Sequence, residues 1–85
     1  MSTKNNINQK IIYLVEIFNQ KKYDDVIQQS NKLLIKGYKI AILYNLIGAS
    51  YSFKNDHTKA IEFYNKSLDL NYNNEEILRN LKLLN

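Results

Sequence analysis

Apolar and small residues recur at helical intervals along most of this chain. Two stripes are the clearest: Tyr44, Ile47, Gly48 and Tyr51 on one segment, and Ala60, Tyr64, Ser67 and Leu68 on the next. Proline is absent and glycine occurs only at Gly37 and Gly48, so the usual punctuation of strands and hairpins is missing. The pattern therefore predicts an all-α chain of five helices, at residues 7–20, 24–36, 41–54, 58–71 and 75–84.

The predicted helix ends have local chemical reasons. Gly37 can end the second helix in a left-handed conformation, which glycine adopts without steric cost. The acidic pairs Asp24–Asp25 and Glu75–Glu76 each open a predicted helix, where negative charge is stabilising, and Asn74 can cap the last one. We therefore interpret both pairs as helix-start residues and not as acid–base catalysts.

A sequence repeat organises the middle of the chain. The residues YDDVI from Tyr23 are echoed by HTKAI from His57, 34 residues later. Residues 41–74 carry Tyr44-x2-Ile47-Gly48-x2-Tyr51, then Ala60-x3-Tyr64, and then Tyr72. This period and order of aromatic, small and apolar positions resemble the tetratricopeptide repeat family, whose pattern is W-x2-L-G-x2-Y, A-x3-F and P.

The resemblance implies a helical-repeat solenoid that forms one domain over residues 1–85. Two helix-turn-helix repeats are expected at 7–40 and 41–74, followed by a capping helix at 75–84. The first repeat matches less well, because Lys10, Leu14, Val26 and Ser30 stand where the second has Tyr44, Gly48, Ala60 and Tyr64. In the last segment Lys82 takes the small-residue position, which favours a solvated cap, although a fragment of a longer protein is the alternative.

Gly48 is predicted to be a close contact between two helices. A glycine inside a helix costs roughly 1 kcal/mol relative to alanine, so it requires a packing reason. The helix that begins near Thr58 supplies that reason, with Ala60 as the opposing small residue. By the same pattern, Tyr44, Tyr51 and Tyr64 are expected to be core residues and not a platform for stacking nucleobases.

Charge and composition exclude several classes of function. The net charge is +4, but lysines and acidic residues are interleaved, and a nucleic-acid surface usually concentrates its basic residues. We expect no nucleic-acid partner, and a steep salt dependence of RNA or DNA binding would contradict this.

Cysteine is absent, which excludes disulfides and thiolate metal sites. The lack of cysteine fits a reducing cytoplasm, where we expect the protein to be. No stretch reaches the roughly 18 apolar residues of a membrane span, so we expect no membrane insertion.

No residue set in the sequence supports catalysis. His57 is the only histidine, it lacks a nucleophile or an orienting carboxylate at useful spacing, and it occupies the repeat position of Tyr23. We interpret His57 as an aromatic packing residue between helices. We expect no enzyme activity, no cofactor and no metal site.

The resemblance implies a concave surface lined by the first helix of each repeat. The positions predicted to bind a partner are Ile11, Val15 and Phe18, then Ile42, Asn45, Ala49 and Phe53, and finally Arg79. Apolar walls with one central amide predict a protein or peptide partner that presents an apolar or amphipathic segment. The alternative is that Ile11, Val15 and Phe18 pack under the first residues or form a homodimer with a second copy.

Some members of this family grip a terminal carboxylate with Lys, Asn and Arg side chains. The matching positions here are Ile11, Val15, Leu46, Glu76 and Asn80. Four of the five cannot donate a hydrogen bond to a carboxylate, and Glu76 would repel one. The surface is therefore not expected to bind free acidic C-termini.

These features together predict a protein–protein interaction module or scaffold. The alternative is an accessory interaction domain cut from a larger bacterial enzyme, because similar repeats resemble those that precede glycosyltransferase and sulfotransferase domains.

Overall fold

The computed structural model describes the backbone of residues 3–71 and the side chains of residues 7–71. Four helices make up this part: α1 (Thr3–Asn19), α2 (Tyr23–Ile35), α3 (Ala41–Phe53) and α4 (His57–Leu70). The predicted all-α class holds for these residues, and three of the four helices begin and end within one residue of their predicted bounds. The predicted helix at 75–84, with Arg79, lies outside the described residues.

The first helix begins earlier than predicted, at Thr3 instead of residue 7. The residues before Ile7 are polar and have no apolar periodicity, so the pattern that locates the other helices has nothing to mark there. They also contain no proline or glycine, so nothing in the sequence stops a helix from extending through them.

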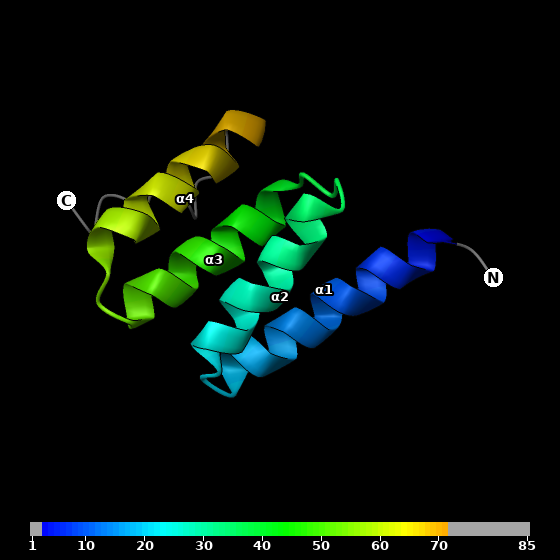
Figure 1. The fold of residues 1–85 in the computed structure, drawn as a ribbon, viewed down its shortest axis with the longest axis horizontal. Coiled ribbons are helices and arrows are strands. Elements are labelled where there is room, and N and C mark those ends of the chain that lie inside the picture. Colours follow the sequence, from blue (N-terminus) through cyan, green and yellow to red (C-terminus); the bar gives the residue numbers. More distant parts are fainter. Residues whose placement is uncertain (1–2, 72–85) are drawn as a thin grey trace.

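The helices follow one another as two hairpins laid side by side (Figure 1). In the first, α1 leads into α2, and in the second, α3 leads into α4; α2 and α1 both contact α3. The helices α3 and α4 are the most closely packed pair, whereas α1 and α2 diverge away from the turn that joins them. The first helices of the two hairpins, α1 and α3, therefore contact each other directly.

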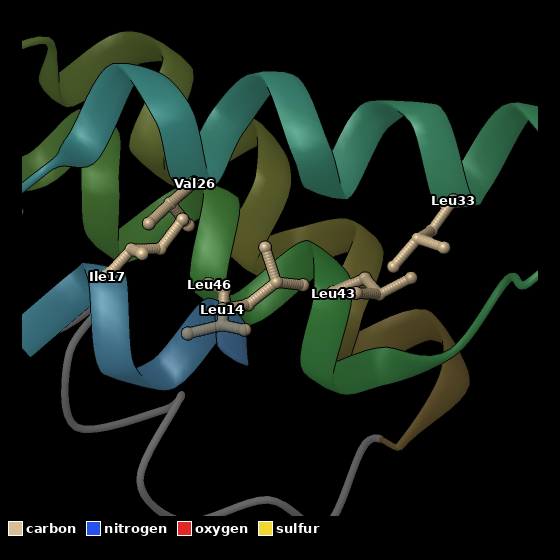
Figure 2. Packing of buried hydrophobic residues seen from close by; sticks show 6 residues of the cluster. All are labelled: Leu14, Ile17, Val26, Leu33, Leu43 and Leu46. Carbon is tan, nitrogen blue, oxygen red and sulfur yellow. The ribbon is translucent and has the colours of Figure 1, made fainter. Parts of the chain in front are cut away.

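A leucine-rich core joins the first hairpin to α3. Its buried residues are Leu14, Ile17, Val26, Leu33, Leu43 and Leu46 (Figure 2). They come from α1, α2 and α3, so this core holds the first repeat against the start of the second. Burying a side chain of this kind stabilises the fold by about 1.5–3 kcal/mol.

The second hairpin has its own core, built around a close helix approach. Ala60 and Tyr64 of α4 are buried at 0% and 3% exposure. A Cβ atom on Gly48 would lie 2.9 Å from Cδ1 of Tyr64 and 3.2 Å from the carbonyl oxygen of Ala60. The predicted close contact at Gly48 is confirmed, and the Tyr64 ring is the side chain that occupies the space.

In the first repeat, the large and the small residue of the two equivalent positions are exchanged. Leu14 stands in the position of Gly48 and Ser30 in the position of Tyr64, and both are buried at 1% and 0% exposure. Of these two repeat positions, the first helix thus carries the larger residue here, whereas the second helix carries it in the second repeat. The poor sequence match of the first repeat is an exchange of volumes and not a loss of its core.

The turns between helices use left-handed residues. After α2, the Gly37 N–H donates to the Leu34 carbonyl at 3.0 Å and the Tyr38 N–H donates to the Leu33 carbonyl at 3.1 Å. This is the Schellman pattern of a helix C-terminus, with Gly37 at φ 105°. The predicted left-handed end at Gly37 is confirmed. The same pair of hydrogen bonds follows α1 and α3, where Lys21 and Asn55 hold the left-handed position.

We expect Lys21→Gly to raise the free energy of unfolding by about 0.5–1 kcal/mol. Lys21 has φ 64°, a conformation that costs a residue with a Cβ roughly 1–2 kcal/mol and costs glycine nothing. Part of the gain is lost because glycine is more disordered in the unfolded chain. Urea denaturation followed by circular dichroism measures the change.

The matched control is Glu16→Gly, at an exposed position inside α1. This change should lower the free energy of unfolding by about 0.5–1 kcal/mol, because glycine there only weakens the helix. Equal losses from the two substitutions would refute the left-handed turn at Lys21.

Helix starts differ between the two repeats. The Asp56 carboxylate accepts a hydrogen bond from the Lys59 N–H at 3.2 Å and caps α4. Lys22 holds the equivalent place before α2 and provides no side-chain cap. Asp24 and Asp25 lie in the first turn of α2, as predicted, where they stabilise the positive end of the helix.

Candidate functional site

The predicted partner-binding positions lie on the first helix of each hairpin, α1 and α3, which contact each other. We call the set Ile11, Val15, Phe18, Ile42, Asn45, Ala49 and Phe53 the first-helix face. Its exposed apolar members are Val15, Ile42 and Phe53, at 37%, 40% and 64% exposure. These three side chains present the apolar surface that a partner would meet.

Other members of the first-helix face are partly used by the fold. Ile11 and Phe18 are half-buried and pack against the leucine-rich core, and Ala49 packs against the core around Ala60 and Tyr64. They therefore expose less apolar surface to solvent than Val15, Ile42 and Phe53 do.

Asn45 is half-buried, and its Oδ1 atom is enclosed by protein with no hydrogen-bond partner among the described residues. A buried acceptor without a donor costs about 1–3 kcal/mol, which marks this amide as unusual in the fold. The role of Asn45 as a polar contact on the first-helix face stays a prediction, in which its amide nitrogen would be the donor.

Three rings come together at one end of the first-helix face. Phe18 contacts Tyr23 edge-on, with ring centroids 5.4 Å apart, and contacts Phe53 edge-on at 5.8 Å. Tyr23 and Phe53 are stacked at 5.2 Å with their planes 6° apart. We call Phe18, Tyr23 and Phe53 the aromatic cluster. It joins α1, α2 and α3, and it leaves most of the Phe53 ring in solvent.

An ion pair accompanies the aromatic cluster. The ammonium of Lys54, directly after Phe53, donates to the carboxylate of Asp24, directly after Tyr23. This hydrogen bond raises the pKa of Lys54 above its usual value. The contribution is present at neutral pH and is lost as the pH rises through the raised pKa. Both groups are exposed, so the pair fixes the end of α3 against α2 more than it adds stability.

Tyr23 was not among the positions predicted to bind a partner. Its repeat position indicated aromatic packing between helices, which the stacking on Phe53 fits. Its proximity to Phe18 and Phe53 depends on how the hairpins stack, and the spacing of residues along one helix carries no signal of that.

His57 differs from the aromatic packing role predicted for it. It is the first residue of α4 and its side chain is exposed, although it holds the repeat position of Tyr23. The physical reason is the neighbouring residue: Phe18, which supports Tyr23 in the first repeat, is replaced by Ser52 in the second. Among residues 7–71, the second repeat therefore offers His57 no counterpart of the Phe18 ring.

No group of three or more His, Cys, Asp or Glu side chains in the described part of the chain is arranged to hold a metal ion. Nor is any helix within residues 3–71 long and apolar enough to cross a membrane.

The comparison with known protein families agrees with the paired helices and the close contact at Gly48. The model of the tetratricopeptide repeat family matches residues 41–74, the segment predicted as the second repeat. Residues 41–74 are therefore similar to a tetratricopeptide repeat. This confirms the resemblance found in the sequence. Among curated proteins, no relative matches the chain.

The match to this family indicates a general role for the hairpin of α3 and α4. Such repeats are generally modules for protein–protein interaction, and they are typically not enzymes. Protein partners are therefore the class of ligand that the family indicates for this chain.

Proposed function

We propose that this chain binds an apolar or amphipathic peptide segment of a partner protein along the first-helix face. The observation that carries the proposal is Phe53. Its ring is 64% exposed, yet it is held in place by Phe18 and Tyr23. A large apolar ring that is both exposed and already ordered loses little conformational entropy when a partner covers it.

The rest of the first-helix face supports the same ligand. Val15 and Ile42 extend the exposed apolar surface from the aromatic cluster along α1 and α3. The amide nitrogen of Asn45 can donate to a backbone carbonyl of the peptide, which fixes its register without requiring a particular side chain. The face is short and has few aromatic anchors, so the expected affinity is micromolar.

The test is a peptide-array screen followed by fluorescence titration of the best hits. Apolar or amphipathic peptides are expected to bind, and Phe53→Asp should weaken them at least about tenfold, because it places a charge where the peptide buries apolar surface. Phe53 is a better probe than Phe18, because Phe18 also packs against the core and its loss would damage the fold.

The matched control is Ile35→Asp. Ile35 is 86% exposed but lies on the second helix of its hairpin, away from the first-helix face. It should leave peptide affinity unchanged. Hits dominated by acidic peptides that must end in a free carboxylate, or equal losses from the two variants, would contradict the proposal.

Self-association is the competing use of the same apolar surface. A homodimer that covers Val15 and its neighbours on α1 would block the peptide. Sedimentation of the free chain at increasing concentration distinguishes the two, because the peptide proposal expects a monomer at the concentrations used for titration.

A further inference from the structure

A pocket of about 120 Å³ lies between α1 and α2. Leu14 of α1 and Leu33 of α2 give it an apolar lining, and Tyr13 and Gln29 add a phenol and an amide. The pocket is near the size of an engineered cavity of roughly 150 Å³ that accommodates benzene. It can therefore take one ring-sized or side-chain-sized group, and it lies on residues separate from the first-helix face.

Three lysines line this pocket: Lys10 from α1, Lys32 from the last turn of α2, and Lys36, which directly follows α2. No acidic residue is among the lining residues. Within residues 3–71, none of the three ammonium groups forms an ion pair. Three like charges around one small apolar space repel one another, so an anion placed among them would be stabilised.

The second repeat shows what normally fills this place. Tyr44 and Phe63 stand 34 residues after Lys10 and Gln29, and their rings are stacked with centroids 6.4 Å apart. They occupy the equivalent space between α3 and α4. The first repeat replaces both rings with polar side chains, and α1 and α2 pack less closely than α3 and α4. The space is left open as a result.

A lysine that both repeats share has different surroundings in each of them. Lys66 is satisfied in the second repeat: its ammonium lies 4.8 Å above the Phe63 ring and 3.4 Å from a carboxylate oxygen of Glu62. Lys32 is its equivalent in the first repeat, where Gln28 stands in the position of Glu62. The first repeat thus keeps the cation and lacks both the ring and the carboxylate that accompany it in the second.

We propose that this pocket binds an oxyanion, a phosphate or carboxylate group, joined to a small apolar group. The lysines donate charge-assisted hydrogen bonds to the anion, and Leu14 and Leu33 cover the apolar part. This inference goes beyond the proposed peptide function and does not rest on it, because the pocket and the first-helix face share none of the residues that define them.

The test titrates the full 85-residue chain with phenyl phosphate and with benzoate, and neutral benzyl alcohol is the control. The backbone NMR signals are followed in each titration. The two anions are expected to shift the signals of residues around Tyr13, Gln29 and Lys32, and benzyl alcohol is expected to bind at least about tenfold more weakly. The phosphate and carboxylate arms show which oxyanion is preferred. Equal affinity for benzyl alcohol, or shifts spread evenly over all lysines, would overturn the proposal.

Two variants make the site assignment sharp. Lys32→Gln should weaken phenyl phosphate several-fold, whereas Lys66→Gln, the same change at the equivalent place in the second repeat, should not. The double variant Lys10→Tyr with Gln29→Phe installs the rings of the second repeat and should abolish binding, with the helical circular dichroism signal retained. Unchanged binding in this folded double variant, or equal losses at Lys32 and Lys66, would refute the pocket as the site.

Discussion

Replacing Gly48 with leucine is expected to destabilise the protein more severely than any surface change. A Cβ atom at this position already comes within 2.9 Å of the Tyr64 ring, and leucine adds three further carbons in the same direction. Overpacking of this kind typically costs 1–3 kcal/mol or more, and each kcal/mol lowers the melting temperature of a domain of this size by roughly 4–8 °C. Thermal denaturation followed by circular dichroism measures the loss.

Two companion variants identify the cause. Asn65→Leu, on the exposed side of α4, adds the same side chain without the contact and should change stability by no more than about 0.5 kcal/mol. Gly48→Leu combined with Tyr64→Ser gives these two positions the residue types that Leu14 and Ser30 have in the first repeat. The double variant should lose less stability than the two single losses added together. Simple additivity would mean that Gly48 and Tyr64 do not share one space.

Leu14→Ala is expected to cost about 2–5 kcal/mol, the range for removing a buried leucine and leaving a cavity. Leu14 is 1% exposed and belongs to the core that joins α1, α2 and α3. The family usually has a small residue at this position. The loss of the Leu14 side chain would therefore be harmless if α1 and α2 could close together. We expect them not to close, because the other buried residues of the same core, from α1, α2 and α3, hold the helices apart.

The control for Leu14 is its neighbour in the sequence. Val15→Ala removes an apolar side chain that is 37% exposed, and it should cost less than about 1 kcal/mol. Urea denaturation of both variants gives the two free energies. A loss at Leu14 no larger than the loss at Val15 would show that the first repeat has no packed core of its own.

The pocket and the first-helix face have different physical origins. The first-helix face exists because two hairpins lie side by side and bring Phe18, Tyr23 and Phe53 together. The pocket exists within a single hairpin, because Lys10 and Gln29 replace a ring pair that fills the second hairpin. A variant that damages one site is therefore not expected to damage the other.

The sequence alone determined the helices α2, α3 and α4, the 34-residue period and the close contact at Gly48. Each of these depends on residues close together in the chain or on a repeated spacing, so periodicity carries the signal. The exposed positions Val15, Ile42 and Phe53 of the candidate site were predictable for the same reason. The early start of α1 was not, because its polar residues carry no apolar period.

Only the tertiary structure decided how side chains from different helices meet. Tyr23 contacts Phe18 of α1 and Phe53 of α3 because the two hairpins stack at a particular distance, which no spacing within one helix encodes. His57, in the same repeat position, stays exposed because its neighbour is Ser52. The lysine-lined pocket likewise depends on how closely α1 and α2 pack, which the spacing of residues along either helix does not encode.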